Sequence, residues 1–171
     1  PAAAVATVRE DFEDGNYSGG PSWTSDSAGA GVRLEVVGGA AHLARTGSRG
    51  VLGTAGLTLP VLAGVTPATA IQFDVRVGAS AVPEGCGLNC AAFPAIVRVR
   101  VRNNNQTESE AWYAFNDDGG RSQQLGNVVI VARGDAPANQ WLRNQRFVIR
   151  EALPRADSII QISLGGVGTD F

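Results

Sequence analysis

The chain has no lysine, no methionine, one histidine and two cysteines. All 14 of its basic residues are arginines, which together with 16 acidic residues leave a net charge of −2. A charge so close to zero provides no overall field that would attract nucleic acid or an anionic membrane. We attribute the exclusive use of arginine to a GC-rich genome rather than to a functional device.

Long hydrophobic runs are also missing. The longest, such as Val128–Ala132, fall far short of the roughly 20 residues that a membrane-spanning helix needs. The opening Pro-Ala-Ala-Ala-Val-Ala has the small-residue character found beside signal-peptidase sites, and no initiator methionine precedes it. We therefore expect an exported protein, located outside the cell, at the cell surface or in the periplasm, without a transmembrane segment.

The two cysteines, Cys86 and Cys90, lie in one loop-like stretch that contains glycine and asparagine. In an exported protein this spacing favours a disulfide that staples a turn, and a pair of free thiols is the alternative. A zinc site needs about four ligands. Because His42 is the only histidine, we do not expect the cysteines to bind a metal.

The length of 171 residues, of which 44% are hydrophobic, predicts one globular domain over 1–171. Apolar residues alternate with polar ones between closely spaced turn residues, as is typical of an all-β sandwich or barrel. Paired glycines at Gly38-Gly39 predict a tight hairpin turn. We predict an all-β, two-sheet antiparallel β-sandwich of jelly-roll-like topology, with strands over Val5–Phe12, Val32–Val37, Ala40–Arg45, Val51–Leu59, Ala70–Val77, Ile96–Arg102, Ala111–Phe115, Val128–Arg133, Arg146–Glu151 and Ile159–Leu164.

The clearest strand carries a row of arginines. Arg98, Arg100 and Arg102 alternate with valines, so the three guanidinium groups share one face, about 7 Å apart at two-residue steps of roughly 3.4 Å. Such a row suits a carboxylate, a phosphate or a sulfated glycan. A solvated outer face is the alternative, and we favour it, because antiparallel sheets usually have one charged side.

Residues for catalysis are few. Glu108 and Glu110 lie on one face of a predicted strand, where they do not readily flank a glycosidic bond from opposite sides. A Ser-His-Asp arrangement would have to use His42, and no Gly-x-Ser-x-Gly sequence is present. We therefore expect a protein that is not an enzyme.

An acidic stretch near the start could hold calcium, which binds six to eight oxygen ligands. Glu10, Glu13 and Asp14 provide carboxylates, and Asp170 could join them if the two ends of the chain meet. The predicted site is a structural calcium ion. Solvated turn acids are the alternative.

Three tryptophans are the largest flat surfaces that could stack on a sugar ring. Trp23 follows a Gly-Pro-Ser turn sequence and is the strongest ligand candidate, with Tyr17 nearby in the sequence. A loop tryptophan that caps the open end of a sandwich core is the alternative.

Two segments resemble a known family. Asp11-Phe-Glu-Asp-Gly-Asn-Tyr-Ser-Gly-Gly-Pro-Ser-Trp-Thr24 is similar to the opening of exported concanavalin-like or laminin-G-like jelly rolls at bacterial surfaces. The stretch Leu153–Phe171 is similar to their penultimate strand and the turn after it. The resemblance implies a jelly roll for sugar binding or surface assembly, often stabilised by calcium and usually without catalysis.

The family pattern continues with one more strand, which predicts that this domain is short of its final strand. A sheet that loses a closing strand presents unpaired backbone groups to a partner chain. The favoured function is an exported, non-catalytic carbohydrate-binding module. The alternative is a structural or accessory subunit of a surface or periplasmic assembly, which contacts partner subunits through a strand edge or an apolar patch.

Overall fold

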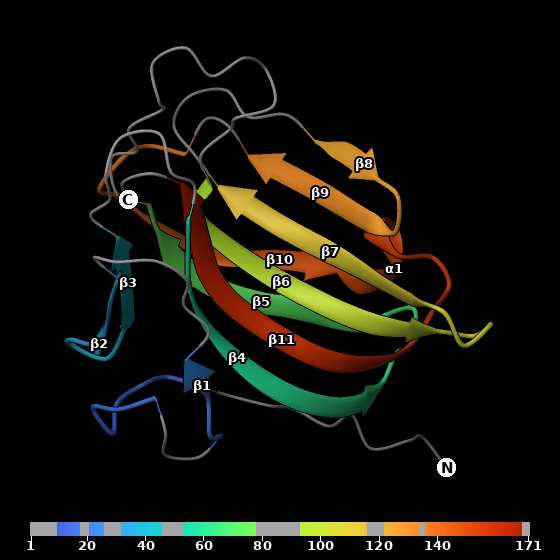
Figure 1. Ribbon diagram of the computed structural model, residues 1–171, viewed down its shortest axis with the longest axis horizontal. Coiled ribbons are helices and arrows are strands. Elements are labelled where there is room, and N and C mark those ends of the chain that lie inside the picture. Colours follow the sequence, from blue (N-terminus) through green and yellow to red (C-terminus); the bar gives the residue numbers. More distant parts are fainter. Residues whose placement is uncertain are drawn as a thin grey trace.

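In a computed structural model, the described part of the protein consists mostly of β-strands (Figure 1). It describes residues 10–17, 21–25, 32–45, 53–77, 93–115, 122–133 and 136–168. The strands are β1 (Thr24–Ser25), β2 (Val32–Val36), β3 (Ala41–Arg45), β4 (Gly53–Gly64), β5 (Ala70–Arg76), β6 (Phe93–Asn103), β7 (Glu108–Phe115), β8 (Gln123–Leu125), β9 (Val128–Arg133), β10 (Trp141–Val148) and β11 (Ala156–Gly168). One helical turn, α1 (Ile149–Ala152), separates β10 from β11.

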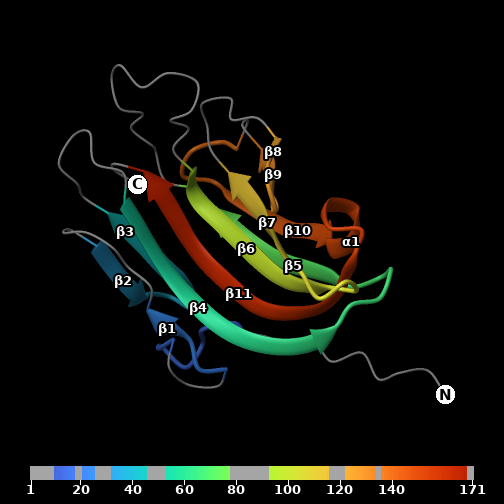
Figure 2. The same cartoon turned by 45° about the vertical axis from the view of Figure 1, so that its right-hand side comes forward.

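The described strands form one large sheet and two small ones. The large sheet has seven strands in the order β1-β4-β11-β6-β7-β9-β8, while β5 pairs with β10 and β2 pairs with β3. All neighbouring strands are antiparallel except β7 and β9, which are parallel. The long strands β4 and β11 run side by side as curved strands (Figure 2).

The strict alternation of valine and arginine in β6 gives the large sheet an apolar face and a charged face. Val97, Val99 and Val101 are buried, with at most 6% of their surface exposed, whereas Arg100 and Arg102, which follow Val99 and Val101, are exposed. This follows from the geometry of a strand, in which successive side chains point to opposite faces. We call the valine side the inner face and the arginine side the outer face.

The inner face is covered by the two small sheets. Phe73 of β5 and Phe147 of β10 pack against Phe115 of β7, with ring centroids 5.8 and 6.1 Å from that of Phe115. Toward the β4 edge, Leu34 of β2 and Leu43 of β3 pack into a second cluster. The main apolar core therefore lies between the large sheet and these two ribbons. A smaller buried cluster, made of Ile96, Ala114 and Ile130, lies on the outer face.

The all-β prediction is confirmed, and most predicted strands coincide with observed ones. The Gly38-Gly39 turn is confirmed by positive φ angles of 58° and 71° and by reciprocal backbone hydrogen bonds between Val37 and Ala40. The predicted strand Arg146–Glu151 is wrong in its bounds, because β10 ends at Val148 and α1 follows. The strand predicted over Val5–Phe12 falls largely outside the described residues, and its last three residues are not in a strand.

Two further differences concern the arrangement of strands. The described strands form three sheets rather than two, and the parallel β7–β9 pair departs from a purely antiparallel arrangement. The last described strand, β11, lies between β4 and β6 and is hydrogen-bonded to both.

The one helix in the described part of the chain has four residues, too few to cross a bilayer.

Candidate functional site

The predicted arginine row lies on the outer face of the large sheet, where β7 supplies partners for two of its three members. The Arg98 guanidinium lies 5.0 Å from the centroid of the Trp112 ring. Arg100 Nη2 lies 2.5 Å from Glu108 Oε2, and Trp112 Nε1 donates a hydrogen bond to Glu110. These contacts pair Arg98 and Arg100 with side chains of β7.

The same contacts bear on the candidate catalytic residues. Glu108 and Glu110 are each held by a neighbour on the outer face, by Arg100 and by Trp112 respectively. His42 on β3 lies with its Nδ1 3.0 Å from Glu35 Oε1. The hydrogen bond from His42, together with Arg33, holds the pKa of the Glu35 carboxyl below its usual range.

Trp23 and Tyr17 are part of the core beside β4. Trp23 is only 6% exposed and packs with Leu57, Leu59 and Phe12, and Tyr17 packs against the same cluster. The indole Nε1 of Trp23 donates a hydrogen bond of 3.2 Å to Glu10 Oε2. This placement corresponds to the core-capping alternative, since a ring buried in this way has no free face for a sugar.

The predicted calcium ligands do not come together in the described part of the chain, which contains no cluster of three or more metal-binding side chains. Glu10 Oε1 accepts the backbone N–H of Phe12, and Asp14 Oδ1 accepts that of Asn16. Both carboxylates thus stabilise local turns, while the Glu13 carboxylate lies beside Gly39. Asp170, Cys86 and Cys90 lie outside the described residues.

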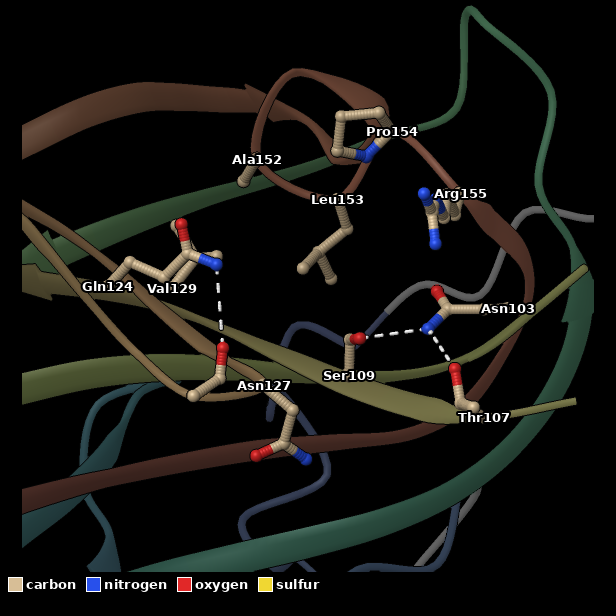
Figure 3. A pocket seen from close by; sticks show the side chains of 11 residues that line it. Asn103, Thr107, Ser109, Gln124, Asn127, Val129, Ala152, Leu153, Pro154 and Arg155 are labelled. Atoms are coloured by element: carbon tan, nitrogen blue, oxygen red, sulfur yellow. Dashed lines mark hydrogen bonds between the residues drawn. The ribbon is translucent and has the colours of Figure 1, made fainter. Parts of the chain in front are cut away.

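A groove lined mainly by amide and hydroxyl side chains lies at the inner face, next to α1 (Figure 3). We call it the amide groove. Its volume is about 280 Å³, and its apolar floor includes Leu153 and Val129. The polar lining comes from the β6–β7 turn, the β8–β9 turn and the segment after α1; these residues are Asn103, Thr107, Ser109, Gln124, Asn127 and Arg155.

Hydrogen bonds hold one wall of the amide groove in place. Asn103 is 5% exposed, and its Nδ2 donates to Thr107 Oγ1 at 3.0 Å and to Ser109 Oγ at 2.8 Å. The backbone N–H of Asn104 donates to the carbonyl of Arg155, which ties the β6–β7 turn to the segment after α1. The groove thus has one wall whose side chains are fixed by hydrogen bonds.

The amide groove was not predicted from the sequence. Asn103 begins a stretch of asparagines that indicates only a turn, and Gln124 and Arg155 lie far from it in the chain. One feature of the sequence could have indicated the groove. Asn103 and Ser109 are polar residues at positions that the strand alternation directs to the inner face. A polar side chain at an inward position needs a partner or a ligand.

Two comparisons with known proteins were negative. No protein-family model matches this chain, and no curated protein matches it. The geometry of the described residues therefore carries the functional argument.

Proposed function

We propose that this protein is an exported, non-catalytic recognition module that binds carbohydrate in the amide groove. The observation that carries the proposal is the chemistry of the lining: amides and hydroxyls around an apolar floor, with Arg155 as the one charged side chain. Sugars present hydroxyl groups that both donate and accept hydrogen bonds, beside ring C–H groups that favour apolar contact. Amide and hydroxyl side chains offer both donors and acceptors to match them.

The non-catalytic part of the proposal rests on where the carboxylates lie. Glu108 and Glu110 are held on the outer face, on the opposite side of the sheet from the amide groove. Glycoside hydrolysis needs two carboxyl groups on either side of the scissile bond. The lining of the amide groove contains no carboxylate.

The proposal includes a jelly-roll-like sandwich for the whole domain and a location at the cell surface or in the periplasm. The ribbons that cover the inner face support a sandwich, because they form a second layer over the large sheet. The structural calcium ion stays a prediction, since Asp170 lies outside the described residues.

A glycan array tests the proposal directly. Wild-type protein is expected to bind at least one neutral glycan, and Gln124→Ala is expected to weaken that binding by about threefold to tenfold, the usual effect of losing one neutral hydrogen bond. Gln140→Ala is the matched control. Gln140 is exposed and precedes β10, at the opposite end of that strand from α1. An array on which the wild type binds no glycan would refute the proposal.

The alternative function, a subunit of a larger assembly, has one observation in its favour. β8 ends the large sheet, and its outer edge has no partner among the described strands. Leu125 on this strand is 56% exposed. The strand has only three residues, however, and short edge strands are a common way to prevent pairing with other chains. Carbohydrate recognition is therefore the better supported function.

A further inference from the structure

A second cavity adjoins the amide groove and shares Gln124, Val129 and Ala152 with it. It has a volume of about 450 Å³ and lies between the β7–β9 part of the large sheet and the end of β10. We call it the tyrosine cavity. Its floor includes Tyr113, Val131 and Phe147, and its polar lining includes Gln123, Gln124 and Glu151.

The hydroxyl of Tyr113 is the exceptional group in this cavity. Tyr113 is 1% exposed, and its Oη is buried without a hydrogen-bond partner among the described residues. Buried polar groups are nearly always paired, because an unpaired one gives up its bonds to water and receives nothing in return. Because Tyr113 is one of the residues that line the cavity, its unpaired hydroxyl is a group that a bound molecule could satisfy.

The ring of Tyr113 is held firmly, which prevents the hydroxyl from turning toward another partner. It stacks on Phe147 with ring centroids 4.2 Å apart, and Phe147 in turn stacks on Phe73 at 5.7 Å. Aromatic contacts of this kind define both the position and the tilt of a ring. The donor is thus in place before any ligand arrives.

The charges around the tyrosine cavity limit what can bind there. Its lining contains no basic side chain, and Glu151 is the one carboxylate. Burial raises the pKa of Tyr113 to about 12, and the Glu151 carboxylate contributes to the rise. The phenol therefore remains a neutral donor near neutral pH. An anionic group placed beside it would face the Glu151 charge without a compensating cation.

We infer that Tyr113 is a ligand-binding residue, whose hydroxyl donates a hydrogen bond to an uncharged sugar ring bound in the tyrosine cavity. This inference rests on the proposed function and deepens it, because it selects neutral hexoses over uronic acids at this subsite. The apolar floor accepts the C–H groups of the ring, and Gln123 and Gln124 offer amides to its hydroxyls.

The test uses methyl hexopyranosides and the matching methyl hexuronides as probes, titrated by ligand-observed NMR. At least one neutral glycoside is expected to bind, with its uronide at least about tenfold weaker, because the carboxylate would lie close to Glu151. Tyr113→Phe is expected to weaken the neutral glycoside by about threefold to tenfold. Tyr17→Phe removes the same hydroxyl from the other tyrosine, in the Trp23 cluster, and is expected to leave binding unchanged.

The thermal unfolding of the free variants provides a second readout. Removal of an unpaired buried hydroxyl is expected to leave the Tm of Tyr113→Phe equal to or above that of the wild type. A lower Tm would mean that the hydroxyl already has a partner in the free protein, and would overturn the inference.

The outcomes separate the inference from the proposed function. Neutral binding that Tyr113→Phe does not weaken would overturn the role of Tyr113 and leave carbohydrate recognition standing. Uronides that bind as tightly as the neutral glycosides would overturn the selection for uncharged rings. If the wild type binds none of these probes and no glycan on the array, the proposed function itself fails.

Discussion

Because the chain has no lysine, the effect of Tyr113 on stability at alkaline pH can be measured with little interference from other side chains. As the pH rises from about 10 to about 12, arginine stays charged, while thiols and the terminal amine have titrated below this range. Tyrosine is then the main side-chain type in this chain that titrates in this range. A change in stability across this interval therefore reports on the tyrosines, and the Tyr113→Phe variant isolates the contribution of one of them.

The size of the change in unfolding free energy follows from the pKa of Tyr113, which burial and the Glu151 carboxylate raise from 10.0 to about 12. Between these values the unfolded chain releases the phenol proton and the folded protein keeps it. The free energy of unfolding therefore falls as the pH rises. Each unit of difference between the folded and unfolded pKa values corresponds to about 1.36 kcal/mol. The loss of unfolding free energy therefore reaches about 2.7 kcal/mol once the pH passes the pKa of the folded state. At about pH 11, half of this loss is expected.

Urea denaturation of wild type and Tyr113→Phe, at about pH 8 and about pH 11, measures the effect. The wild type should lose about 1.4 kcal/mol more than the variant between these two conditions. Tyr17→Phe is the control, and it should still show the loss of unfolding free energy that Tyr113 causes. The ultraviolet absorbance of tyrosinate, taken as the difference between wild type and Tyr113→Phe, follows the same proton in the folded state. Equal losses in wild type and Tyr113→Phe would refute the assignment of a buried, neutral phenol.

Three further variants test the packing and the turns, each by urea denaturation at neutral pH. Leu57→Ala should cost about 2–5 kcal/mol, because Leu57 is 2% exposed and the variant leaves a cavity; a cost under about 1 kcal/mol would contradict its place in the core. Gly38→Ala should cost about 1–2 kcal/mol through its φ of +58° alone, since nothing lies within 4 Å of an added Cβ, and a neutral result would argue against this turn. Asn103→Ala should cost about 1–3 kcal/mol, because it removes the hydrogen bonds to Thr107 and Ser109; full stability would show that these bonds do not hold the groove wall.

Much of the fold could be read from local pattern. The alternation of valine and arginine in β6 predicted both a strand and its two faces, because side chains alternate across any strand. The glycine pair before β3 predicted the hairpin, because both residues need positive φ angles. Each of these features depends on residues within a few positions of one another.

The candidate site was far less predictable. Trp23 follows a turn sequence, which suggested a surface position, yet its indole packs against Leu57 and Leu59 from a distant strand. The partners of Arg98 and Arg100 come from β7, so their pairing depended on the strand neighbour and the register. Tyr113 offered no signal in the sequence beyond its place on an inward-facing position.

The sequence by itself determined the β-strands, their alternating faces, the tight glycine turn and the uniform arginine chemistry that makes the alkaline titration simple. These follow from local geometry and composition. Only the tertiary structure decided that β11 lies between β4 and β6, that β7 and β9 run parallel, and that three distant segments meet around Asn103. Strand order and cavities arise from contacts between residues far apart in the chain, and a local pattern carries no record of which strands will be neighbours.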